Sequence, residues 1–368
     1  MVRKLAVVGF VVVTVLAPDA SARPNAFDPR GKSPDEILAH YGLGGGEGCL
    51  QFVDATAVAF RKEQWLRAAQ SMYQADPGFV LDWIVGAAPP PSRAVAEAEK
   101  QRDCMVARMV TDAADPSSSL VLDWQKDPAS KRDMGGVLIR FRQNPTFARN
   151  MVAAITESAY RDARTQSWIW KRKFVFSGRN FNVVSATAAQ KCGLSAGHTW
   201  KPDDVRHQRC WGSVLSASER EHEILQASAA PGISRHHWGT DFDFFGLNPA
   251  HFTARGRLAD EYAWLRDHAV EFGFFQPYTR NDAATGHGYM EERWHWSYFP
   301  IGQALLEFAQ AHQERVGTAL AAQWSAFEVI WNAGYDGERP FFTFVRTHWR
   351  EFMFNVDDLH MRRRPRVE

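Results

Sequence analysis

The sequence predicts an α+β protein in which helices pack against a small antiparallel sheet. Two observations support this fold class. Residues 23–135 and 301–333 consist mainly of helix-favouring runs. Between them, short aromatic segments such as 242–245, 274–275 and 290–298 are predicted as strands and alternate with helical stretches.

The first 22 residues have the pattern of a secretory signal peptide. Arg3 and Lys4 form a positive end, Leu5 to Leu16 is apolar, and Ala20-Ser21-Ala22 fits a cleavage site. The apolar run is too short to span a bilayer comfortably. We therefore expect a periplasmic or secreted protein with no stable membrane insertion after cleavage, and an uncleaved anchor is the alternative.

Residues 23–135 are predicted to form a helical accessory region. Ser33-Pro34-Asp35-Glu36 is a helix start with a capping residue followed by proline. Helical runs are expected over 57–74 and 94–110, and Asp76-Pro77-Gly78 should end the first of them. No catalytic or ligand pattern stands out in this region.

Residues 136–300 are predicted to be the core domain, followed by a helical C-terminal extension over 301–368. We expect a short helix opening at Asn144-Pro145-Thr146, a strand over 153–156 and a helix over 164–174. Residues 176–221 are rich in glycine, serine and polar side chains, and they are predicted to be an inserted loop. An amphipathic helix is expected over 258–272.

Charge and cysteine content narrow the function classes. The leader carries Arg3, Lys4 and Asp19, so its removal takes Lys plus Arg from 43 to 41 and Asp plus Glu from 42 to 41. A neutral chain argues against a nucleic-acid partner held by a general positive field. The arginines of the C-terminal tail are interpreted as a solvated terminus rather than a wall- or lipid-contacting patch.

The four cysteines are expected to form disulfides in an exported protein. Three connectivities exist for four cysteines. Proximity in the sequence favours Cys49–Cys104 and Cys192–Cys210.

Two short motifs carry the chemistry. His236 and Asp243 lie in the run from Ser234 to Asp243, and His295 follows about fifty residues later in Glu292-Arg293-Trp294-His295. Two imidazoles and one carboxylate form a three-ligand set for a catalytic zinc whose fourth position takes water. A structural zinc site usually has four protein ligands, so this set disfavours a purely structural zinc domain.

These motifs resemble the zinc D-alanyl-D-alanine carboxypeptidases of the VanY type, which trim bacterial cell-wall peptides. Ser234-x-His236-x-x-Gly239-x-x-x-Asp243 and Glu292-x-Trp294-His295 match two family elements. A third element, Ser-x-Tyr-Arg-x-x-x-x-Gln, is matched by Ser158, Tyr160, Arg161 and Gln166. The resemblance covers residues 136 to 300.

The resemblance implies a role for each of these residues. His236, Asp243 and His295 would bind zinc, and Glu292 would be the general base. Arg161 would stabilise the oxyanion or hold the substrate carboxylate. The motif also implies that four residues contact the peptide: Ser158, Tyr160, Gln166 and Ser234.

Three positions need a structural explanation. Strand alternation alone would place Glu291, rather than Glu292, on the face of His295, so Glu292 requires a turn before His295. His237 should point away from the metal if its segment is extended. Asp241 would be a partner for a ligand histidine or a solvated carboxylate.

The preferred function is therefore hydrolysis of peptidoglycan stem peptides by a zinc peptidase, most simply a D-Ala-D-Ala carboxypeptidase. One alternative is an endopeptidase on the same fold, with residues 176–221 setting the choice of bond. Another is a catalytically silent cell-wall-binding module. Retention of both Glu292 and Arg161 disfavours that module, since pure binding requires neither residue.

Overall fold

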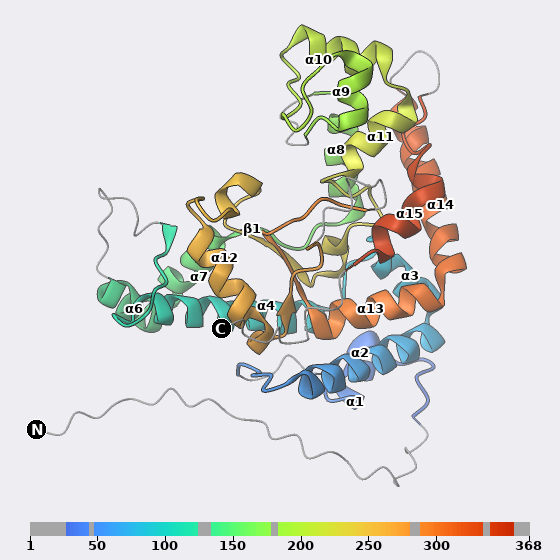
Figure 1. Cartoon of the computed structure of the whole chain (residues 1–368). Helices are drawn as coiled ribbons and strands as arrows, with labels where there is room; N and C mark the ends of the chain where they lie inside the picture. The colour runs from blue at the N-terminus through green and yellow to red at the C-terminus, as the bar shows by residue number, and fades with distance from the viewer. Residues whose placement is uncertain are drawn as a thin grey trace, which may run out of the picture.

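The chain folds around a four-stranded antiparallel sheet with strand order β1-β2-β4-β3. The structure is a computed structural model and describes residues 27–43, 48–123, 134–177, 183–279, 288–333 and 339–356. The strands are β1 (Thr156–Ser158), β2 (Asp241–Phe244), β3 (Phe274–Phe275) and β4 (His295–Tyr298). Helices surround this sheet (Figure 1), so the α+β fold class is confirmed.

The strand register brings the two sequence motifs together. Asp243 on β2 lies opposite His295 on β4, and Asp241 lies opposite Ser297. Directly opposed residues in an antiparallel pair have their Cβ atoms about 5 Å apart. The sheet therefore closes the gap of about fifty residues between the motifs.

The described part of the N-terminal region contains four helices, three of which begin at a residue whose side chain caps the helix. They are α1 (Pro34–His40), α2 (Ala55–Ala75), α3 (Pro77–Ile84) and α4 (Ser92–Ala113). Ser33 and Glu36 make the predicted capping box. Asp76 ends α2 as expected, and its side chain also caps α3, which begins at Pro77.

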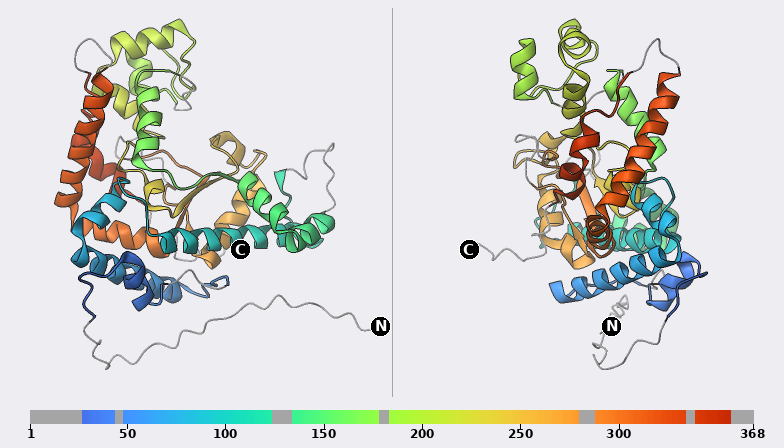
Figure 2. Two further views of the ribbon diagram at one scale, coloured as in Figure 1. Left: turned by 180° about the vertical axis from the view of Figure 1, so that it is seen from behind. Right: turned by 90° about the vertical axis from the view of Figure 1, so that its right-hand side faces the viewer.

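The N-terminal helices support the segment that carries the first motif. The Trp83 indole donates to the Trp238 carbonyl (3.3 Å), and the Trp238 indole donates to the Ile84 carbonyl (3.0 Å). Both indole rings are buried. Helix α2 packs along α13 (Phe299–Ala311) beneath the sheet (Figures 1 and 2).

Glu97 joins α2, α4 and β4 through one buried carboxylate. It accepts hydrogen bonds from Arg61 (3.0 and 2.7 Å), the Trp65 indole (3.3 Å) and the Tyr298 hydroxyl (2.8 Å). A carboxylate buried with this many donors is paired and solvated by protein groups. The N-terminal helices and the sheet thus share one polar anchor.

Three helices lead into and out of β1. They are α6 (Met134–Gln143), α7 (Pro145–Ile155) and α8 (Ala163–Phe174). The strand predicted over 153–156 is wrong for its first three residues, because α7 continues to Ile155 and β1 begins only at Thr156. The helix predicted over 164–174 is confirmed as α8, whose N-cap is Asp162.

The segment predicted as an inserted loop is a helical lobe. It contains α9 (Ala186–Cys192), α10 (Val205–Arg209), the π-helical turn η2 (Cys210–Val214) and α11 (Ala217–Leu225). Trp200 and Trp211 pack edge to face at 5.0 Å in its centre. The helices are too short to be stable alone or to show a clear periodicity in the sequence. The aromatic packing between them stabilises them instead. The lobe stands above α8 in Figure 1.

Both predicted disulfides are present. Cys49 pairs with Cys104, and Cys192 pairs with Cys210. The second bridge joins α9 to the start of η2 within the lobe.

Between β2 and β4 the chain forms mainly short helices. These are η4 (Pro249–Phe252), α12 (Ala259–His268) and η5 (Ala269–Phe272). The helix predicted over 258–272 therefore divides into an α-helical and a 3₁₀ part. The strand predicted over 290–298 is wrong for its first half, since β4 begins at His295 after a turn.

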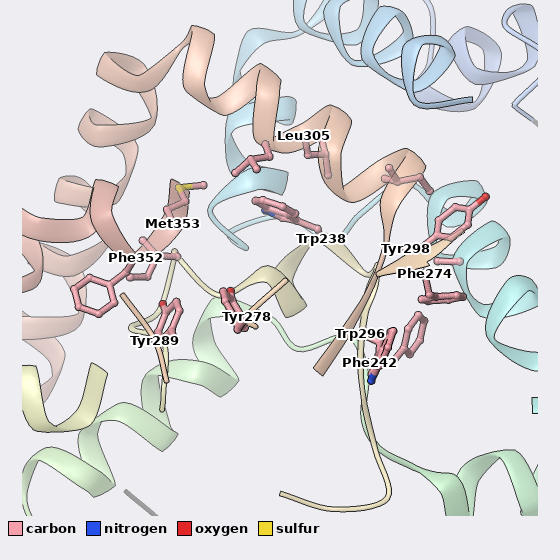
Figure 3. Close-up of a cluster of buried hydrophobic side chains, with 14 of the residues drawn as sticks. Trp238, Phe242, Phe274, Tyr278, Tyr289, Trp296, Tyr298, Leu305, Phe352 and Met353 are labelled. Atoms are coloured by element: carbon pink, nitrogen blue, oxygen red, sulfur yellow. The ribbon is translucent and has the colours of Figure 1, made fainter. Parts of the chain in front are cut away.

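The C-terminal helices complete one continuous hydrophobic core. They are α13, α14 (Gln313–Asn332) and α15 (Val345–Phe354). Aromatic side chains of the sheet, including Phe242 and Trp296, lie in the same buried cluster as Leu305 of α13 and Phe352 of α15 (Figure 3). Within the described ranges no helix is long and apolar enough to cross a membrane. The expected signal peptide and the basic tail lie outside these ranges.

Candidate metal centre and cleft

Three buried side chains from two strands and one helical turn meet at the end of the sheet. His236 lies on the 3₁₀ turn η3 (Arg235–Trp238), Asp243 on β2 and His295 on β4. Their ligand atoms all lie within 4.8 Å of one another. His236 Nε2 is 3.3 Å from one Asp243 oxygen, and His295 Nδ1 is 3.3 Å from the other.

Each histidine is oriented by a hydrogen bond from its other nitrogen. His236 Nδ1 lies 2.8 Å from the Ala159 carbonyl oxygen, which can only accept. His295 Nε2 lies 2.9 Å from Asp241 Oδ1. With the opposite nitrogens held in this way, His236 Nε2 and His295 Nδ1 are the ring nitrogens that face Asp243.

Asp241 is fully buried and serves His295 rather than solvent. Besides His295, it accepts hydrogen bonds from Arg235 Nε (3.0 Å), the Thr240 hydroxyl (2.6 Å) and the Ser297 hydroxyl (3.1 Å). Burial by itself raises the pKa of Asp241, but Arg235 and His295 outweigh it and hold that pKa well below its usual range. Of the two interpretations of Asp241 from the sequence, the contacts support the partner of a candidate ligand histidine, His295, over the solvated carboxylate.

Arg235 closes the network behind Asp241. Its guanidinium also donates to Ser297 (2.6 Å) and lies 4.5 Å from the ring centroid of Trp238. A Cβ at Gly302 would lie 2.7 Å from an Arg235 nitrogen. Glycine at this position therefore lets α13 approach the buried guanidinium.

Glu292 reaches the centre because the chain turns before β4. The amide of His295 donates to the Glu292 carbonyl (3.2 Å), which closes a turn over Arg293 and Trp294. One Glu292 carboxylate oxygen lies 3.2 Å from His295 Nδ1. Glu291 instead pairs with Arg293 at 3.0 Å. The turn that the Glu292 assignment requires is thus present.

Arg161 lies beside the same carboxylates. Its charge interacts with Asp243 and Glu292, and burial lowers its pKa despite these two anions. The Nε of Arg161 is buried without a hydrogen-bond partner. A desolvated guanidinium with a spare donor is suited to bind an incoming anion.

His237 fixes the backbone of Arg161 and does not face the metal centre. Its Nδ1 donates to the Arg161 carbonyl (2.6 Å), and its Nε2 accepts from the Gly232 amide (3.0 Å). Burial lowers the pKa of His237 to about 3, so the ring is neutral. The ring leaves no room at Gly86, where a Cβ would lie 2.5 Å from it.

These groups open onto a cleft of about 630 Å³. Its floor holds His236, Asp243, Glu292, His295 and Arg161, with Tyr278 and Tyr289 among the surrounding residues. The hydroxyl of Tyr289 is buried without a partner.

The remaining predicted contact residues divide into two groups. Gln166 and Ser234 line the cleft. The side-chain nitrogen of Gln166 donates to the Ala229 carbonyl (2.6 Å), and its side-chain oxygen is buried without a hydrogen-bond donor. Tyr160 is 40% exposed and is not brought into the cleft. The backbone of Ser158 pairs with β2 opposite Asp243, and its side chain lies outside the described set.

Sequence reasoning missed three cations that line the cleft, Arg172, Arg235 and Lys173, and a helical pattern identifies Lys173. It lies on α8 seven residues after Gln166, and Ile169 between them also lines the cleft. A spacing of three, four and seven residues places side chains on one helix face. This periodicity, counted from Gln166, is the signal that would have found Lys173.

The charge balance of the centre fits a bound cation. Burial lowers the pKa of His295, but its hydrogen bonds to Asp241 and Glu292 and the charge of Asp243 outweigh burial and raise that pKa to about 10. One Asp243 oxygen is also buried without a hydrogen bond. The carboxylates therefore stabilise positive charge at this point, and two imidazoles with a carboxylate are zinc ligands by type.

Comparisons with known proteins identify the same part of the chain. The family model "VanY: D-alanyl-D-alanine carboxypeptidase" matches residues 143–301, a span that contains every site residue described above. No curated protein matches the chain.

Two solved structures are similar to part of it. The LdcB LD-carboxypeptidase is 19% identical, with 52% of this chain and 76% of that chain covered and a TM-score of 0.23. VanYB in complex with D-alanine-D-alanine is 18% identical, with 53% and 87% covered and a TM-score of 0.24.

Proposed function

We propose, from the premise that residues 143–301 belong to the VanY family of D-alanyl-D-alanine carboxypeptidases, that this chain is a zinc-dependent peptidase of peptidoglycan stem peptides. The bond we assign is the one before a C-terminal D-alanine. The observation that carries the proposal is the convergence of His236, Asp243 and His295 with Glu292 at the floor of one cleft.

Zinc would be held by His236 Nε2, Asp243 and His295 Nδ1. When bound, zinc polarises the scissile carbonyl and lowers the pKa of the attacking water. Ala159 and Asp241 bind the outer nitrogens of the two imidazoles, which supports a ligand set oriented before zinc binds and displaces the proton of His295.

Glu292 would move the proton. Its carboxylate lies beside His295 Nδ1, on the turn that precedes β4. It is therefore close to the proposed ligands without being one of them. It would take one proton from the attacking water, whose oxygen bonds to the carbonyl carbon, and would deliver that proton to the nitrogen of the leaving amine as the carbon–nitrogen bond breaks.

Arg161 would stabilise the negative charge that develops on the carbonyl oxygen. Its position beside Asp243 and Glu292 and its unpaired Nε support this role. The buried Gln166 side-chain oxygen, which has no hydrogen-bond partner, would accept a backbone N–H of the peptide, and the Ser234 hydroxyl would contact the peptide in the same cleft.

Product analysis on defined muropeptides tests the proposal. With zinc bound, a pentapeptide ending in D-Ala-D-Ala should lose one alanine, as seen by mass spectrometry, and a chelator should abolish the loss. Release of an internal fragment would instead establish an endopeptidase. Absence of any product from the zinc-loaded protein would favour a wall-binding module.

The remaining parts of the proposal concern location. The signal-like pattern of residues 1–22 would export the chain to the periplasm or the medium, where its peptidoglycan substrate lies. The two disulfides are compatible with such an oxidising compartment.

A further inference from the structure

We infer that Lys173 is a specificity-determining residue that pairs with the C-terminal carboxylate of the substrate, which leaves Arg161 for the oxyanion. The inference rests on the proposed function and deepens it. It follows from the position of Lys173 on the face of α8 that lines the cleft and from the charges of the groups around it.

Helix α8 forms one wall of the cleft. Gln166, Ile169, Arg172 and Lys173 of this helix line it, and Ser228 lines it on the neighbouring segment. Lys173 donates a hydrogen bond to the Ser228 hydroxyl, which holds the ammonium on the cleft wall. The long side chain is therefore ordered and not extended into solvent.

Lys173 lies near the catalytic groups. Its charge interacts with Glu292, which favours the ammonium, and with Arg161, which disfavours it. Burial is the largest influence and lowers the pKa of Lys173 to about 8. A desolvated ammonium is an energetic cost in the free protein, and an anionic ligand would offset that cost.

The chemistry of the leaving group identifies the anion. Glu292 delivers its proton to the leaving amine, and in a carboxypeptidase substrate that amine and the terminal carboxylate belong to one residue. Only the Cα atom separates them, so the carboxylate lies within about one residue length of Glu292. Lys173, whose ammonium interacts with Glu292 and lines the cleft, is therefore close enough to bind the terminal carboxylate.

The reaction presents two negative charges, and four cations line the cleft: Arg161, Arg172, Lys173 and Arg235. Arg235 is paired with Asp241 and Arg172 is exposed, so we assign the two charges to Arg161 and Lys173. Arg161 also interacts with Asp243, a zinc ligand, and so lies at the reacting carbonyl. Lys173 instead donates its hydrogen bond to Ser228, which lies on the segment after α11. The oxyanion and the carboxylate therefore have different partners.

The test is a cycle of two substrates and two proteins. The substrates are a D-Ala-D-Ala pentapeptide and the same peptide with its C-terminus amidated. The proteins are the zinc-loaded wild type and Lys173→Met, which keeps the length of the side chain and removes the charge. We expect kcat/KM of the wild type to fall about 10- to 100-fold on amidation, the range of a charge-assisted hydrogen bond.

In Lys173→Met the free peptide should already show that fall, and amidation should add little. Lys173→Arg should recover part of the preference for the free carboxylate. Lys171→Met, a variant of the same helix whose residue does not line the cleft, should behave as the wild type. Equal zinc content in all variants separates recognition from loss of the metal centre.

An amidation penalty in Lys173→Met as large as in the wild type would overturn the inference, as would a wild type indifferent to amidation. The inference would also be overturned if the loss of kcat/KM in Lys173→Met were reproduced in the wild type by blocking an internal carboxylate of the peptide, and not by amidating its C-terminus. If the wild type hydrolyses neither peptide, the proposed function fails. The role of Lys173 is then tested by calorimetry, which compares the affinities of the protein for D-Ala-D-Ala and for its C-terminal amide. Equal affinities, or no binding of either, would then reject it.

Discussion

Replacement of Asp241 by asparagine should perturb the candidate metal centre without changing a proposed ligand. Asparagine keeps the size of the side chain and can still accept hydrogen bonds from Arg235 and His295. The change removes one negative charge from a fully buried group that has four hydrogen-bond partners. Two consequences follow, one for zinc and one for stability.

The zinc effect arises through His295. The carboxylate of Asp241 fixes the proton on Nε2 and makes Nδ1 a stronger donor to the metal. Loss of such a partner typically weakens metal binding about 10- to 100-fold, which corresponds to roughly 1.4 to 2.7 kcal/mol. Asp241→Asn should therefore bind zinc with a Kd raised by that factor.

The stability effect arises through Arg235. Its guanidinium is buried, and Asp241 is its ion-pair partner at 3.0 Å. Breaking a buried pair by neutralising one member costs about 3 to 5 kcal/mol. The unfolding free energy of the metal-free variant should fall by this amount.

Competition with a chromophoric chelator measures the zinc Kd, and denaturant unfolding of the metal-free protein measures stability. Thr240→Val is the matched control, because it removes one hydrogen bond to Asp241 and leaves its charge and its contact with His295. The control should keep zinc affinity within a few-fold. If Asp241→Asn binds zinc as tightly as the wild type, Asp241 does not act through His295 and the reasoning is wrong.

Three further predictions follow from the same contacts. Glu292→Gln should retain zinc while kcat falls about 100- to 10,000-fold; near-full turnover would move the base to another group. Zinc affinity should weaken about tenfold for each unit of pH lowered between 8 and 6, because the pKa of His295 is about 10 and zinc must displace that proton; a Kd independent of pH would contradict this. Loss of the Cys192–Cys210 bridge in a double serine variant should lower the unfolding free energy by roughly 3 kcal/mol, the value of the chain-entropy model, and should weaken substrate binding. The zinc stoichiometry should stay unchanged, because all three proposed ligands lie outside the lobe. Simultaneous loss of zinc would show that the lobe supports the metal centre.

The proposed ligand set could be predicted because it depends on residue types at fixed spacings. His236 and Asp243 are seven residues apart, and the sheet register that joins them to His295 follows from pairing two short strands. Asp241 was open to two interpretations, since only the fold shows that Arg235 and Ser297 converge on it. Charge networks of this kind join residues far apart in sequence and leave no periodic signal.

The lobe over 183–225 was not predictable as helical for a different reason. Its helices span five to nine residues, below the length at which intrinsic propensity decides. Packing of Trp200 against Trp211 and burial of Glu223, which accepts from the Trp200 indole (3.0 Å), stabilise them instead. Such tertiary contacts override a polar, glycine- and serine-containing sequence.

The central claim is that His236, Asp243 and His295 hold one catalytic zinc ion. Anomalous diffraction from crystals of the zinc-loaded protein, recorded on both sides of the zinc absorption edge, tests it most directly. The account predicts a single strong peak at the floor of the cleft within about 2.2 Å of His236 Nε2, an Asp243 oxygen and His295 Nδ1. Absence of a peak there, or a peak coordinated by other side chains, would contradict it.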